Sequence, residues 1–392
     1  MRSPKTEWPK TDWTVRALRL VILALFGAVL ALGTPSGLSG DAWAQTQTET
    51  NDRGVEPEMP MMGNVPGASA GNASDSEIWR AVRNGIQGTV SIPDKQAGVL
   101  VQSEGDNWRA WRNGPVTVSG VWIVLGMCGL LALFFAIRGR IRVESGMSGE
   151  TLERFNGLER FAHWLTASCF IILALTGLNM LYGKHVLLPA LGPEAFAALT
   201  LGGKYAHNYL AFGFMLGVVL MFVLWVRDNL PNKYDMHWIA EGGGLFSKGV
   251  HPPSRKFNFG QKIIFWSVVL GGLSLSLSGL ALLFPFQIII FEPTFQALNA
   301  IGLRMPTGIT AMEEMQLSQV WHGVVGLIMI AIILAHIYIG SLGMEGAFDA
   351  MGSGHVDENW AREHHNVWVA ELKGEPLPDP DEPHSGAAQP AE

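Results

Sequence analysis

The sequence predicts an all-α membrane protein in which a four-helix bundle follows one extra N-terminal transmembrane helix. The chain has 392 residues, of which 48% are hydrophobic and only 16% are charged. This composition excludes both an ordinary soluble protein of this size and a chain that is disordered throughout. Apolar runs of about twenty residues are long enough to cross a bilayer as helices. Such runs occur at 117–137, 161–181, 206–226, 263–284 and 317–342.

Residues 1–44 are predicted to be an export signal. Basic residues lead into a short apolar stretch at 18–32, and Ala42-Trp43-Ala44 matches a signal-peptidase cleavage site. An uncleaved anchor is the alternative, and both interpretations place the following residues outside the membrane. Residues 45–116 are then expected to form a polar linker and, after Glu77, a small periplasmic module.

Basic residues in the loops predict how the helices are oriented. Five Lys and Arg lie at 138–160 and six at 227–262, whereas the other two connections hold two and one. Because positively charged loops stay in the cytoplasm, the last helix ends inside and the tail 346–392 is cytoplasmic. The tail is expected to be helical near 360–372 and disordered at its end. The chain is thus predicted to be a multi-pass protein of the bacterial inner membrane.

Four histidines lie inside the apolar runs, where ionisable side chains are costly and mark functional candidates. By this topology His163 and His336 lie near the cytoplasmic side, and His207 and His322 near the outer side. The fourteen residues from His322 to His336 span about 21 Å and nearly four helical turns, so both share one face. Depth therefore sorts the four histidines into two pairs, each joining the last helix to a different partner helix.

Two facing imidazoles in a helix bundle suit a bis-histidine haem, whose iron takes one nitrogen from each side of the porphyrin. Zinc would need more ligands, and the sequence has no H-E-x-x-H motif. Cys128 and Cys169 lack C-x-x-C-H spacing, so the haem would be non-covalent and of b type. Small residues such as Gly177 and Gly323 would let a flat macrocycle approach, although helix packing explains each glycine equally well. The prediction is two b haems about 20 Å apart that conduct electrons across the membrane.

Distinct motifs surround these histidines and fill the loops between the helices. One precedes His163 as R-F-N-G-L-E-R-F-A-H-W, and another opens the run at 263–284 as K-F-N-F-G-Q-K. Their order, the fourteen-residue spacing and the loop sequences occur together, which makes the set specific. The stretches are 154–164, 204–207, 256–262, 265–267, 321–323, 335–338 and 360–365.

In these stretches, over about residues 150–370, the chain resembles the gamma subunit of membrane-bound respiratory formate dehydrogenase, the cytochrome b556 anchor. The resemblance implies a four-helix di-haem cytochrome b domain at 150–345. It also implies that His163 and His336 bind the inner haem iron and that His207 and His322 bind the outer haem iron. These are the pairs that depth alone predicts. The N-terminal third departs from the short members of the family, and this leaves the subunit contacts open.

The family's quinone site lies beside the inner haem, where Asn258 and Gln261 match polar residues. Three residues apart on a helix, they share a face and could hydrogen-bond a quinone carbonyl. An N-terminal helix cap is the alternative interpretation. His364 and His365 are expected to lie at the surface or at a partner contact.

The resemblance further implies electron transfer and quinone reduction within a formate:quinone oxidoreductase. Electrons would arrive from an iron–sulfur beta subunit, and an alpha subunit with molybdenum or tungsten would oxidise formate. An alternative is the cytochrome b anchor of a nickel–iron hydrogenase or a thiosulfate-type reductase, which would use the same two-haem arrangement. A transporter or channel that uses the histidines as a proton relay is the alternative from a different class.

Overall fold

The computed structural model describes residues 105–245 and 249–379. The predicted export signal, the predicted linker and nearly all of the predicted periplasmic module lie outside these residues, as does the end of the tail. In the described part of the chain, four helices are long and apolar enough to cross a membrane. These helices are α4 (Thr117–Arg138), α5 (Gly157–Trp225), α7 (Phe259–Leu283) and α9 (Ala311–Tyr338).

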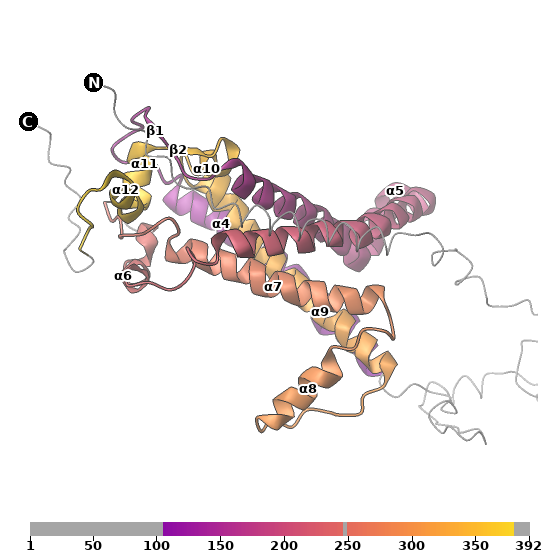
Figure 1. Cartoon of the computed structure of the whole chain (residues 1–392). Helices are drawn as coiled ribbons and strands as arrows, with labels where there is room; N and C mark the ends of the chain where they lie inside the picture. The colour runs from indigo at the N-terminus through magenta and orange to yellow at the C-terminus, as the bar shows by residue number, and fades with distance from the viewer. Residues whose placement is uncertain (1–104, 246–248, 380–392) are drawn as a thin grey trace, which may run out of the picture. The chain divides into compact units, whose positions relative to one another are not determined.

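The five apolar runs of the sequence map onto these four helices. Three runs coincide with α4, α7 and α9, and the other two both lie in α5. In the bundle, α7 packs against both α5 and α9, and α4 packs against α9 (Figure 1). The chain ahead of α4 is already helical, because α3 (Gly105–Trp111) and a π-helical segment (Arg112–Val116) lead into it.

The long helix α5 consists of two arms joined by a sharp turn. Its 69 residues would measure about 104 Å if straight, several times the thickness of a bilayer core. Gly192 interrupts the helix with a φ of 78° and a ψ of 168°, and Pro189 and Pro193 flank it. The chain therefore reverses at Gly192, and the second arm returns along the first (Figure 1).

Gly217 lets the two arms of α5 pack closely. A Cβ added there would lie 3.1 Å from the Cα of Thr166, whereas a Cβ added at Gly126 on α4 would meet nothing within 4 Å. We expect Gly217→Ala to lower the free energy of unfolding by about 1–3 kcal/mol because the arms must separate. Gly126→Ala should leave it unchanged or raise it by up to about 1 kcal/mol, since alanine favours a helix. Denaturant titration of both variants in detergent compares them, and equal stability of the two would contradict the packing argument.

Three of the membrane-length segments begin at capping boxes. In each, a polar side chain at the N-cap accepts from the backbone N–H three residues later, and the side chain at that position accepts from the N-cap N–H. This reciprocal pattern is local, so it fixes where each helix begins. The pairs are Asn156 with Glu159, Asn258 with Gln261, and Thr310 with Glu313.

A small cap closes one end of the bundle and is formed by the C-terminal segment and the stretch before α5 (Figure 1). Two three-residue strands, which the all-α expectation did not include, pair antiparallel with Thr151 opposite Asp357. The helical stretch expected at 360–372 is two helices that break at His365, where φ is −148°. The cap comprises β1 (Thr151–Glu153), α10 (Asp349–Gly352), β2 (His355–Asp357), α11 (Glu358–His364) and α12 (Asn366–Lys373).

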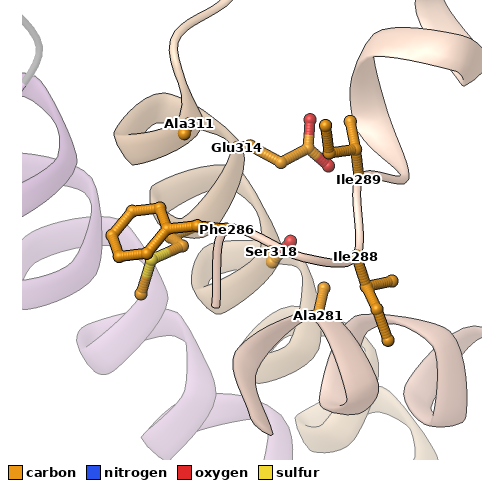
Figure 2. Close-up of a pocket in the computed structure, with 8 residues that line it drawn as sticks. Ala281, Phe286, Ile288, Ile289, Ala311, Glu314 and Ser318 are labelled. Atoms are coloured by element: carbon orange, nitrogen blue, oxygen red, sulfur yellow. The ribbon is translucent and has the colours of Figure 1, made fainter. Parts of the chain in front are cut away.

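At the opposite end, a buried carboxylate attaches helix α8 (Phe291–Ala300) to α9. Glu314 of α9 points at the segment that leads into α8 and lines a small pocket there (Figure 2). Its Oε1 accepts from the backbone N–H groups of Ile290 and Phe291, both at 2.6 Å, and Oε2 accepts from Glu292 at 3.1 Å. A carboxylate at a helix N-terminus satisfies donors that have no partner within the helix. The side chain thus fixes the loop between α7 and α9.

Candidate functional site

His163 and His336 face each other between α5 and α9, near the cap. His163 lies in the second turn of α5, and His336 lies in the last turn of α9. Their ring centroids are 6.2 Å apart, with 63° between the ring planes.

His207 and His322 form a second pair with nearly the same geometry. His207 lies in the second arm of α5, and its ring centroid is 6.2 Å from that of His322, with 64° between the planes. The structure therefore brings together the same histidines that depth pairs in the sequence. Both pairs share α9, where fourteen residues correspond to a rise of about 21 Å.

The spacing within each pair fits a metal between two imidazoles. A metal bound by one nitrogen on each side, about 2 Å away, places the ring centroids roughly 6 Å apart. The helices α5 and α9 make few direct contacts, and at His163 and His336 a cavity lies beside the facing rings. Within residues 105–245 and 249–379, no three His, Cys, Asp or Glu side chains converge as a metal site. A porphyrin would supply the remaining ligands of a metal held by one histidine on each side.

Hydroxyl groups hold the outer edges of the His207 and His322 rings. Thr176 Oγ1 lies 2.8 Å from Nδ1 of His207, and Ser278 Oγ lies 2.9 Å from Nδ1 of His322. In contrast, Nδ1 of His163 is buried and has no hydrogen-bond partner in the described part of the chain. Of these two hydroxyls, the sequence had singled out only Thr176, and as a small residue. No sequence signal distinguishes them, because the hydroxyl-Gly dipeptide at 176–177 and 278–279 also occurs at 119–120, 145–146 and 353–354.

A cavity of about 800 Å³ surrounds His163 and His336. Ligand sites in proteins commonly measure about 300–1,000 Å³. Apolar side chains such as Phe134 of α4 and Phe170 of α5 line most of it, and Asn258 and Gln261 lie on its wall. The helix α4 is therefore part of the cavity wall and not a detached anchor.

Asn258 and Gln261 serve as the capping box of α7. Asn258 Oδ1 accepts from the Gln261 N–H at 2.9 Å, and Gln261 Oε1 accepts from the Asn258 N–H at 3.1 Å. Gln261 Oε1 also receives a long hydrogen bond, 3.4 Å, from Nη2 of Arg154. The cap interpretation that the sequence left open is correct for the oxygens of both amides. In addition to capping α7, both side chains lie on the wall of the cavity.

Arg154 places a positive charge beside this cavity, a feature that the sequence did not single out. Its side chain is 3% exposed, and Nη2 donates to the carbonyl of Lys256 at 2.6 Å. The guanidinium also lies 5.3 Å from the ring centroid of Trp360 and 5.5 Å from that of Trp368. Burial lowers the pKa of Arg154 to about 9, which keeps it charged at neutral pH.

The expectation that His364 and His365 lie at the surface is wrong for His365, and His364 is half-buried. His365 is 1% exposed, and its Nδ1 donates to the carbonyl of Arg255 at 2.8 Å. Burial lowers the pKa of His364 to about 4, so its ring is neutral at pH 7. Both rings pack against Trp360 and line the cavity. His365 is buried and His364 is half-buried because α11 folds back onto the bundle, a contact between distant parts of the chain that a local pattern does not encode.

The four paired histidines lie in the part of the chain that matches a known protein family. Residues 154–354, just over half of the chain, match the family described as prokaryotic cytochrome b561. This range contains all four paired histidines, whereas α4 lies before it.

The chain is also similar to cytochrome b subunits of two bacteria. It is 26% identical to the "Formate dehydrogenase, cytochrome b556(fdo) subunit" of Escherichia coli K12, over 57% of this chain and 94% of that protein. The nitrate-inducible b556(Fdn) subunit of the same organism is 26% identical, over 55% of this chain and 89% of its own length. The Haemophilus influenzae formate dehydrogenase cytochrome b556 subunit is 24% identical, over 54% and 79%. The family match and the membrane-length helices lead to one conclusion: the chain belongs to the prokaryotic cytochrome b561 family, integral membrane proteins that carry haem b and transfer electrons.

Proposed function

We propose that this chain is the membrane-anchoring cytochrome b subunit of a formate dehydrogenase and passes electrons through two b haems to a quinone. The proposal rests on the two histidine pairs that share α9, each with 6.2 Å between its ring centroids. The names of its relatives support formate as the source of the electrons. Haem b, when bound, supplies reversible one-electron chemistry at each pair.

The proposed residue roles follow from the geometry. His163 and His336 would hold one haem iron, and His207 and His322 would hold the other. Nδ1–H donation to a hydroxyl leaves Nε2 of His207 and His322 free for a metal. The apolar side chains around His163 and His336 would exclude water from the porphyrin faces.

The direction of transfer rests on the charge of the loops. Arg138 ends α4, Arg140 and Arg142 follow it, and the loop at 227–262 is also basic. These charges favour the cap end as the cytoplasmic side. His207 and His322 would then lie near the periplasm, together with residues 45–116. An iron–sulfur subunit would deliver electrons there, and a further subunit, not this chain, would oxidise formate.

Quinone reduction is proposed in the cavity beside His163 and His336, near Asn258 and Gln261. The amide oxygens of both residues are occupied in the capping box, so their amide N–H groups are the available donors for a quinone carbonyl. Quinone reduction there would take up protons from the cytoplasm. Because the electrons come from the other side of the membrane, the reaction would build up a membrane potential.

The purified chain is expected to bind two haems b per polypeptide. A reduced-minus-oxidised absorbance spectrum and a pyridine haemochrome assay measure the type and the number. A stoichiometry near one would contradict the assignment of both pairs. Absence of b-type bands would favour the proton-relay alternative. Subunits that co-purify with the chain distinguish formate dehydrogenase from a hydrogenase or a thiosulfate-type reductase.

A further inference from the structure

Two matching dipeptides contact the rings of His207 and His322. Thr176-Gly177 of α5 lies against His207, and Ser278-Gly279 of α7 lies against His322. A Cβ added at Gly177 would lie 3.6 Å from Cε1 of His207, and one added at Gly279 would lie 3.3 Å from Cε1 of His322. In each case the hydroxyl holds the edge of the ring, and the glycine lets the ring approach the helix.

The direction of each hydrogen bond follows from the other bonds of the hydroxyl. Thr176 Oγ1 donates to the carbonyl of Ile172 at 2.8 Å, and Ser278 Oγ donates to the carbonyl of Ser274 at 2.8 Å. A hydroxyl has one hydrogen, which these backbone bonds use. Both hydroxyls therefore accept from the histidine, and the backbone carbonyls of Leu173 and Leu275 are further acceptors for the rings of His207 and His322. The proton is thus fixed on Nδ1, and the lone pair is left on Nε2.

In the His163–His336 pair, at least one ring lacks a hydrogen bond from Nδ1 to a hydroxyl. Nδ1 of His163 is buried without a hydrogen-bond partner among the described residues. A hydrogen bond from Nδ1–H makes an imidazole a stronger electron donor to its metal. A stronger donor stabilises the oxidised metal relative to the reduced one, so the two pairs differ in the property that sets a reduction potential.

We propose that Thr176 and Ser278 are positioning residues that lower the midpoint potential at the His207–His322 pair below that at the His163–His336 pair. One electron then moves downhill along α9. The iron that His207 and His322 would hold would be oxidised, and the iron that His163 and His336 would hold would be reduced. This inference rests on the proposed function, because it requires one haem at each pair.

The test is a redox titration of the purified, haem-loaded chain and of Thr176→Val, Ser278→Ala and the double variant. The wild type should titrate with two midpoints. Each single variant should raise the lower midpoint and leave the upper one in place. A roughly tenfold change in the equilibrium between the two sites corresponds to about 59 mV for one electron. In the double variant the lower midpoint should rise further than in either single variant.

Ser276→Ala is the matched control. Ser276 lies on the same helix as Ser278, and its Oγ also donates to a backbone carbonyl, that of Gly272 at 2.7 Å. Its hydroxyl makes no hydrogen bond to a histidine of the described residues. Both midpoints should remain at their wild-type values. Thr176→Ser and Ser278→Thr keep the hydroxyl and should restore the wild-type lower midpoint, which loss of packing alone would not.

Ser278→Cys provides a graded variant that keeps the side chain nearly the same size. Sulfur is a weaker acceptor than oxygen, so its shift should lie between those of serine and alanine. An unchanged lower midpoint in haem-replete Ser278→Cys and Thr176→Val, or an equal shift of both midpoints, would overturn the inference. A wild type with fewer than two haems would instead refute the proposed function on which it rests.

Discussion

Replacing His322 with alanine is expected to reduce the haem content of the purified chain from two to one. The substitution leaves His207 as the only imidazole at that pair, and a b-type haem held by one weak bond dissociates during purification. The His163–His336 pair lies about 21 Å away along α9 and shares no side chain with it, so its haem should remain. The pyridine haemochrome assay counts the haem, and a redox titration shows which midpoint disappears.

Two further substitutions serve as comparisons for His322→Ala. His336→Ala should also leave one haem, but with the other midpoint. His355→Ala removes an exposed histidine of β2 and should leave both haems in place. If His322→Ala kept two haems with unchanged midpoints, the assignment of this pair would be wrong.

Lys262→Met is expected to lower the free energy of unfolding by about 3–5 kcal/mol, because it leaves a buried carboxylate without its partner. The Nζ of Lys262 lies 2.7 Å and 2.8 Å from the two oxygens of Asp235 and 3.0 Å from the carbonyl of Leu230. The two side chains are only 4% and 9% exposed. This ion pair attaches α6 (Tyr234–Ala240) to the first turn of α7. Denaturant titration in detergent, followed by circular dichroism, measures the loss.

A surface ion pair of the same chain is the control. Arg255 and Glu371 are 2.7 Å apart, but their side chains are 51% and 33% exposed, so Arg255→Met should cost at most about 1 kcal/mol. The double variant Lys262→Met with Asp235→Asn removes the unpaired charge and should recover part of the stability. Equal losses for Lys262→Met and Arg255→Met would show that burial does not determine the effect.

The histidine pairing could be predicted from sequence because a membrane reduces the problem to depth. The length of an apolar run gives a helix, the charge of the loops gives its direction, and position along the run then gives the depth of His163 or His322. The capping boxes are equally local, since each depends on residues three apart, such as Asn258 and Gln261. The apolar runs nevertheless begin at 161 and 263, four residues after α5 and α7 begin, because the first turn of each helix is polar.

Features that depend on distant contacts could not be predicted in this way. Strand β1 is three residues long and exists only because Thr151 pairs with Asp357, about two hundred residues later. The burial of His365 likewise requires the cap to fold back over Arg255. The roles of Thr176 and Ser278 depend on which rings approach them, and no spacing within one helix specifies that contact.

The sharing of α9 by both histidine pairs has a mechanical consequence. A continuous helix is a stiff rod, because every change in its length must stretch a series of backbone hydrogen bonds. The distance between the two histidine pairs is therefore insensitive to small movements of the cap or of the α8 loop. A twist of this one helix, in contrast, would move His322 and His336 together and misalign both sites at once. The shared helix thus keeps the spacing of the two pairs constant, whereas a rotation of α9 would affect both pairs together.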